Sequence, residues 1–167
     1  MSSSHDKAED GVSRGVKIGI DVTLGDDVFI EDGTILGDNV IIEDQVIIMQ
    51  DVVIGDHTHI SRDTLLKKGA SVGNHCMIGE GCTFGKKSIV RNFVEIGDVV
   101  HVKCKAIIGD NVEIANGAQI GRGARVNNGA EIGADTRVHK YELVKANHVV
   151  CTINGERWPK APAKKPS

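Results

Sequence analysis

A six-residue period runs through nearly the whole chain, because every sixth residue from Val12 to Val138 is apolar. The residues at this spacing are Val12, Ile18, Leu24, Ile30, Leu36, Ile42, Ile48, Ile54, Ile60, Leu66, Val72, Ile78, Phe84, Val90, Ile96, Val102, Ile108, Ile114, Ile120, Val126, Ile132 and Val138. Hydrophobic residues make up 40% of the chain, so chance would produce such a run on the order of once in a billion trials. The period therefore reflects the architecture.

A second column, four residues after each large aliphatic, holds small or β-branched residues from Val16 to Thr136. An extended strand places this column and the next large aliphatic on one face, since they are two residues apart. The residue three after the aliphatic is often of a type that tolerates positive φ: Gly33, Asn39, His57, Asp63, Gly69, His75, Gly81, Asn111, Gly117, Gly123, Gly129 and Asp135. Each hexad is predicted to be a short strand followed by a corner.

The composition agrees with an all-β fold and argues against several classes of function. With three Phe, one Tyr and one Trp against 20 Gly in 167 residues, aliphatic side chains must fill the interior. A net charge of −3 creates no overall field for nucleic acid or a membrane surface. No stretch approaches 18 consecutive apolar residues, and the N-terminus lacks a secretory signal, so we expect a cytoplasmic protein without a membrane partner. The four cysteines lack metal-ligand spacing.

Residues 54–59 (Ile-Gly-Asp-His-Thr-His) and 108–113 (Ile-Gly-Asp-Asn-Val-Glu) resemble the repeat of the hexapeptide-repeat acyltransferase-like superfamily. This resemblance implies a single left-handed parallel β-helix of about seven triangular coils, each of 18 residues, and the chain has no long loop insertions. We predict a disordered N-terminal segment over residues 1–11, the β-helix over 12–143, a closing segment over 144–158 and a disordered basic tail over 159–167.

Stacking at 18-residue spacing allows the faces to be considered separately. One face carries an outward aliphatic column of Ile35, Val53, Ile89 and Ile107. We expect it to face a neighbouring subunit, since members of the family are usually trimers; exposed aliphatics or cover by the C-terminal segment are the alternatives. A second face carries Glu95, Glu113 and Glu131, predicted to be a solvated acidic stripe, with a bound cation or basic partner as the alternative.

Positive charges gather at the corner that follows the third face: Lys67, Lys68, Lys86, Lys87, Lys103, Lys105, Arg122 and Lys140. Clustered amines hold phosphates, and the resemblance implies acetyl-CoA or another acyl-CoA as donor. The predicted cofactor-binding residues are Lys68, Lys86, Lys87, Lys105 and Arg122, and solubilising charge is the alternative. Aromatic residues do not interleave with these charges, which argues against nucleic acid.

The resemblance also implies a histidine base at a cleft between subunits. His59 and His101 are predicted to point outward from strands and are the candidate catalytic residues, whereas His57 and His75 occupy the turn column and are expected to be structural. The predicted function is acyl transfer to an amino or hydroxyl group of a sugar or sugar nucleotide. The alternative is a non-catalytic scaffold, binding or regulatory module. The histidine spacing of γ-class carbonic anhydrases is absent, so we predict no metal.

One coil departs from the repeat. Over residues 87–105 the turn column holds Lys87, Phe93, Val99 and Lys105, and the β-branched Val99 is poorly suited to positive φ. Such a departure indicates either a requirement of packing or function, or sequence variation in one turn without such a requirement.

Overall fold

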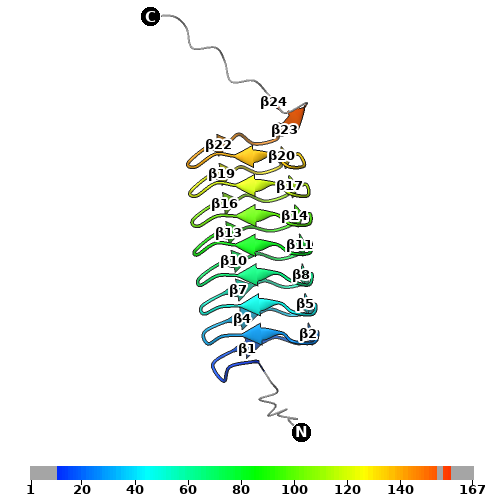
Figure 1. Ribbon diagram of the computed structural model, residues 1–167. Coiled ribbons are helices and arrows are strands. Elements are labelled where there is room, and N and C mark those ends of the chain that lie inside the picture. The colour runs from blue at the N-terminus through cyan, green and yellow to red at the C-terminus, as the bar shows by residue number, and fades with distance from the viewer. Residues whose placement is uncertain (1–10, 154–155, 159–167) are drawn as a thin grey trace, which may run out of the picture.

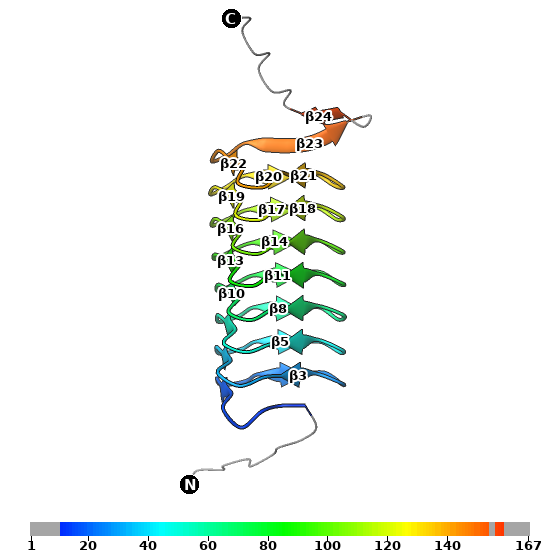
Figure 2. The same ribbon diagram turned by 60° about the vertical axis from the view of Figure 1, so that its left-hand side comes forward.

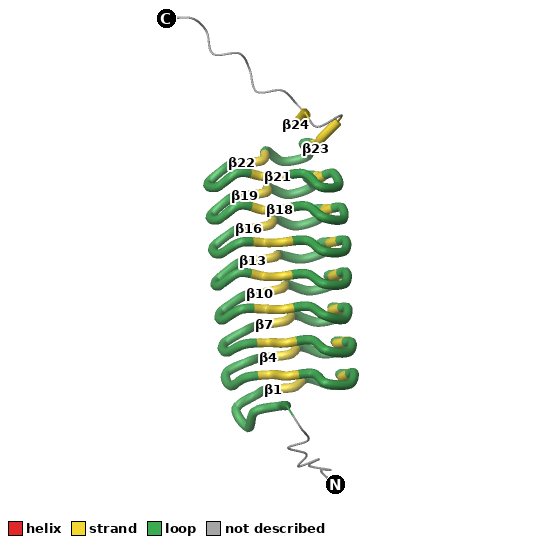
Figure 3. The backbone as a smooth tube through the Cα atoms, viewed as in Figure 1, coloured by secondary structure: helices red, strands yellow, loops and turns green. Residues whose placement is uncertain are grey.

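The computed structural model describes residues 11–153 and 156–158, which form one straight stack of triangular coils (Figure 1). The predicted tail at 159–167 and, apart from Gly11, the predicted N-terminal segment lie outside the described residues. Twenty-two two-residue strands alternate with corners, as Figure 3 shows, and two longer strands end the fold. The all-β prediction is confirmed, and the described residues include no helix long and apolar enough to cross a bilayer.

Successive strands belong to successive sheets, so three parallel sheets form the faces of a prism. Sheet I contains β1 (Lys17–Ile18), β4 (Ile35–Leu36), β7 (Val53–Ile54), β10 (Ser71–Val72), β13 (Ile89–Val90), β16 (Ile107–Ile108), β19 (Arg125–Val126) and β22 (Leu143–Val144). Sheet II contains β2 (Thr23–Leu24), β5 (Ile41–Ile42), β8 (His59–Ile60), β11 (Met77–Ile78), β14 (Glu95–Ile96), β17 (Glu113–Ile114), β20 (Glu131–Ile132), β23 (Val149–Ile153) and β24 (Glu156–Trp158). Sheet III contains β3 (Phe29–Ile30), β6 (Ile47–Ile48), β9 (Leu65–Leu66), β12 (Thr83–Phe84), β15 (His101–Val102), β18 (Gln119–Ile120) and β21 (Arg137–Val138).

The register of the parallel pairs is the predicted 18 residues. Ile35 pairs with Val53 in sheet I, and Glu95 pairs with Glu113 in sheet II. Each coil therefore contributes one strand to every sheet, and residues 18 apart in sequence are neighbours along the prism axis.

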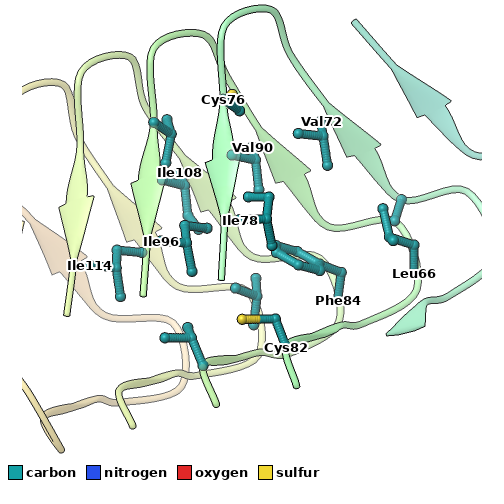
Figure 4. Packing of buried hydrophobic residues seen from close by; sticks show 14 of the residues in the cluster. Leu66, Val72, Cys76, Ile78, Cys82, Phe84, Val90, Ile96, Ile108 and Ile114 are labelled. Carbon is teal, nitrogen blue, oxygen red and sulfur yellow. The ribbon is translucent and has the colours of Figure 1, made fainter. Parts of the chain in front are cut away.

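The interior contains both columns found in the sequence. Every large aliphatic of the six-residue period from Ile30 to Val138 is buried, and Phe84 takes one of these positions. Side chains from the three sheets converge there, as Figure 4 shows for Ile78, Phe84 and Val90. Ile18, in the first described coil, is 48% exposed. A narrow triangular interior leaves little room for aromatic rings, which explains the aliphatic composition.

The corners depend on positive φ, as the turn column predicts. All twelve residues expected to tolerate it have φ between 52° and 76°. The departing coil keeps the same geometry with less suitable residues, since φ is 57° at Phe93 and at Val99. His57, His75 and Phe93 stack ring on ring at one corner, with centroids 4.8 and 5.0 Å apart. The two histidines are thus corner residues, as predicted.

A ladder of side-chain hydrogen bonds links the coils at the corner after sheet I, here called corner I–II. Six successive backbone N–H groups donate to the carboxylate or amide oxygen of the residue 18 later. The donors are Ile20, Asp38, Asp56, Asn74, Asn92 and Asp110. The ladder supplements the strand bonds and ties each coil to the next.

At the C-terminal end of the stack the chain reverses its direction (Figure 2). β23 continues sheet II beside β20 and then pairs with β24, which returns antiparallel to it. Arg157 in β24 forms an ion pair with Glu142 in the last coil. Trp158 pairs through its backbone with Cys151 while its side chain stays 53% exposed, so the backbone of β24, rather than a buried indole, covers the end of the sheet.

Candidate functional site

Sheet III leads at each coil into the corner that carries the predicted phosphate-binding cations; this corner is called the basic edge. Its cations are Lys67, Lys68, Lys86, Lys87, Lys103, Lys105, Arg122 and Lys140. Each coil turns there through a tight four-residue turn, shown by the 2.9 Å bond from the Ala70 N–H to the Lys67 carbonyl and the 3.1 Å bond from the Ser88 N–H to the Gly85 carbonyl. The regular turns place the cations in columns along the prism axis.

Most of these cations have no counter-ion in the described part of the chain. Lys68 is the exception, since its ammonium lies 3.4 Å from a carboxylate oxygen of Asp51 and 3.0 Å from the Gln50 side-chain oxygen. Lys140 lies over the ring of Tyr141, 5.0 Å from its centroid. The side chains without a hydrogen bond or ion pair among described residues are Lys67, Lys86, Lys87, Lys103, Lys105 and Arg122. The basic edge is therefore a surface of uncompensated positive charge suited to anions.

His101 lies on β15, the strand that runs into the basic edge. It pairs in register with Thr83 and Gln119 and is half-buried. Its imidazole has no hydrogen-bond partner among the described residues, and Lys103 follows two residues later. An imidazole without a partner is available both to accept a proton and to contact a ligand.

His59 lies on a different face. It belongs to β8 of sheet II, and its Nε2 is 2.7 Å from a carboxylate oxygen of Glu43. The structure therefore does not bring the two candidate bases together. Of the two, His101 alone lies on the sheet that leads into the basic edge.

Sheet II carries a shallow groove of about 510 Å³ that the sequence did not predict. Its walls include His59, Met77 and the three stacked carboxylates, Glu95, Glu113 and Glu131. Gly79, Gly97 and Gly133 also line the groove. The glycines were visible in the sequence 18 or 36 residues apart, and this spacing next to the glutamate column was the available signal.

The acidic groove and the basic edge have opposite electrostatic character. Carboxylates disfavour phosphate groups in the groove, whereas the amines of the basic edge attract them. No group of three or more His, Cys, Asp or Glu side chains in the described ranges is arranged to hold a metal ion.

Known proteins share the repeat and the fold of this chain. Residues 33–68 match the family described as bacterial transferase hexapeptide (six repeats). No curated protein sequence matches this chain significantly. A solved hexapeptide transferase family protein from Anaplasma phagocytophilum is 16% identical, with 90% of this chain and 87% of that one covered and a TM-score of 0.62.

A second similar structure is the UDP-N-acetylglucosamine O-acyltransferase of Moraxella catarrhalis. It is 14% identical, the match covers 87% of this chain and 72% of that one, and the TM-score is 0.54. At this identity the likeness establishes the fold. The chain therefore has the left-handed parallel β-helix fold, and residues 33–68 carry the hexapeptide repeat that the family model describes.

Proposed function

We propose that the protein is a cytoplasmic acyltransferase that moves an acyl group, most simply acetyl, from acyl-CoA to an amino or hydroxyl group of a sugar or sugar nucleotide. The observation that carries the proposal is the placement of His101 on the strand that runs into the uncompensated cations of the basic edge. The similar Moraxella catarrhalis structure, whose name specifies acyl transfer to a sugar nucleotide, supports the class of reaction.

The chemistry assigns each group a role. Lys68, Lys86, Lys87, Lys105 and Arg122 bind the phosphates of the donor. The base accepts the proton of the acceptor amine or hydroxyl as this nucleophile attacks the thioester carbonyl. The carbon–sulfur bond then breaks, and CoA leaves as the thiolate, which is protonated. The reaction needs no metal ion.

His101 is the first candidate for the base and His59 the second. His101 shares a face with the donor-binding cations, whereas the groove beside His59 is lined with carboxylates that repel a phosphate-rich donor. His59 has in its favour the 2.7 Å contact with Glu43, because a carboxylate partner holds an imidazole in a defined orientation.

The proposed assembly is a homotrimer packed through sheet I. Ile35, Val53 and Ile89 are 40%, 41% and 40% exposed, and Ile107 continues their column in a half-buried position. An aliphatic column on a flat sheet buries apolar area well against a second copy. The cleft between subunits then completes the site. Light scattering tests the assembly, with dissociation expected for Ile89→Asp and not for Glu113→Gln on sheet II.

The test of activity is a mass-spectrometric assay for acyl products, with acetyl-CoA and a panel of amino sugars and nucleotide sugars. We expect His101→Ala to lower kcat by about 100-fold or more with little change in the KM for acetyl-CoA, and His59→Ala to have a small effect. Lys86→Glu with Arg122→Glu should raise that KM, whereas Lys145→Glu at another corner should not. Loss of activity in His59→Ala alone would reverse the assignment of the base.

The second candidate function is a non-catalytic binding or regulatory module. It is favoured by the unbroken regularity of the coils, since functional loops are usually inserted into such scaffolds and none interrupts β1 to β22. Absence of a thermal shift at millimolar acetyl-CoA, together with absence of any acyl product, would establish this alternative.

A further inference from the structure

The backbone of the basic edge differs from that of the laddered corner. At corner I–II an Asp or Asn side chain accepts the outward N–H of the preceding coil, as Asn74 does for Asp56. The equivalent positions at the basic edge are Lys68, Lys86, Cys104, Arg122 and Lys140. Lysine and arginine side chains have no acceptor atom, and thiol sulfur is a weak acceptor. These five N–H groups accordingly have no acceptor among the described residues.

The unsatisfied N–H groups coincide with the unpaired cations. Lys86 and Arg122 carry both an unbonded backbone N–H and an unpaired side chain. Cys104, small and half-buried, lies between them in the same column, and Lys103 and Lys105 flank it in sequence. Each coil here presents a peptide donor beside one or more cations, the combination that binds phosphate oxygens.

Carboxylates border the basic edge but do not interrupt it. The four successive turns at residues 67–70, 85–88, 103–106 and 121–124 contain no Asp or Glu. Asp51, one coil before, pairs with Lys68, and Glu142, in the last turn, pairs with Arg157. The positive surface is therefore continuous along the axis from Lys67 to Arg122.

The length of the row exceeds what a single nucleotide donor needs. Parallel strands are about 4.8 Å apart, so the five equivalent positions from Lys68 to Lys140 span about 19 Å in a straight line. The part of the edge between Lys67 and Arg122 contains no aromatic residue on which a base could stack. The repeat favours a chain of closely spaced phosphates without bases.

We infer that the basic edge binds a linear polyphosphate chain lengthwise, through the backbone N–H groups and cations of successive coils. This inference goes beyond acyl transfer and is independent of it, because a protein without transferase activity would present the same row of donors. The polymer and the acyl donor share Lys86 and Arg122, so polyphosphate is also expected to compete with acetyl-CoA.

The test is fluorescence anisotropy with end-labelled polyphosphates of three, about fifteen and about sixty phosphates, at several salt concentrations. We expect the fifteen-phosphate chain to bind about tenfold or more tightly than triphosphate, with a steep dependence of affinity on salt. Lys86→Ala with Arg122→Ala should weaken binding of the long chains and reduce the salt slope by about two, whereas Lys145→Ala should change neither.

Three outcomes would overturn the inference. Equal affinity for triphosphate and the longer chains would reduce the edge to a nucleotide-sized site, and the proposed acyl transfer would be untouched. Unchanged binding by the double variant, with its circular dichroism spectrum intact, would place the anions elsewhere. Tighter binding of single-stranded DNA than of polyphosphate of equal charge would identify a nucleic-acid site instead.

Discussion

The side-chain oxygen of Asn74 accepts a 2.9 Å hydrogen bond from the backbone N–H of Asp56, one coil earlier, and the same oxygen occupies the space beside Gly55. A Cβ at Gly55 would lie within 2.1 Å of it. The asparagine oxygen, 19 residues further along the chain, and the backbone of its coil therefore leave no room for a side chain at Gly55.

Substitutions at Asn74 and Gly55 should distinguish the stability contributed by the hydrogen bond from the cost of placing a side chain at the glycine. We expect Asn74→Ala to lower the free energy of unfolding by about 1 kcal/mol, since the Asp56 N–H loses its acceptor. Gly55→Ala should cost more, because its Cβ also lies 2.7 Å from the carbonyl carbon of Gly73. Urea denaturation measures both. Asn127→Ala, whose side chain makes no hydrogen bond among described residues, is the control, and an equal loss there would contradict the explanation.

Ser88 offers a stabilising substitution. Its hydroxyl is fully buried in the interior without a hydrogen-bond partner among the described residues, and Ala70 and Ala106 occupy the equivalent positions in adjacent coils. Ser88→Ala should raise the free energy of unfolding by about 1–2 kcal/mol, because a buried unsatisfied hydroxyl is removed. Thr58→Val is the matched control and should destabilise, since the Thr58 hydroxyl donates to the Gly73 carbonyl at 2.8 Å.

Val99 tests the conformational requirement of the turn column. A β-branched residue at φ 57° is held in a region that costs roughly 1–2 kcal/mol for ordinary L-residues and less for asparagine. Val99→Asn should therefore raise the melting temperature, and Asn111→Val, at φ 55°, should lower it. Calorimetry of both variants provides the measurement. A destabilising Val99→Asn would indicate that contacts of the valine outweigh the backbone strain.

The cysteines should divide into two reactivity classes. Burial raises the pKa of the Cys82 thiol to about 11 and raises that of Cys76, whereas Cys104 and Cys151 are half-exposed. Iodoacetamide at pH 8 should modify Cys104 and Cys151 in the native protein and all four cysteines after unfolding, as peptide mass spectrometry would show. Native labelling of Cys82 at the rate of Cys104 would mean that the coils open locally.

The same pKa shift makes stability depend on pH in alkali. The folded pKa of Cys82 lies above the ordinary value of 9.0, so the unfolded chain releases the thiol proton first. The contribution of the neutral thiol is complete below pH 9 and is lost as pH rises through about 11. The free energy of unfolding should fall more steeply across this window in the wild type than in Cys82→Ala. Identical slopes would contradict the assignment.

The six-residue period predicted the short strands and the corners, including the positive φ at His57 and Asn111. The resemblance to the hexapeptide-repeat superfamily, which implies three hexads per coil, added the 18-residue register and with it the acidic column. The exposure of the Ile35 and Ile89 column followed from the same periodicity.

The tertiary structure alone decided which side chains find partners. Glu43 reaches His59 from a corner one coil earlier, Lys68 finds Asp51, and Lys86 and Arg122 find no counter-ion among the described residues. The antiparallel return of β24 over β23 also departs from the repeat. Periodicity specifies which positions are adjacent, but hydrogen bonds and ion pairs form only within a few ångströms and in suitable directions, and those depend on the folded coils.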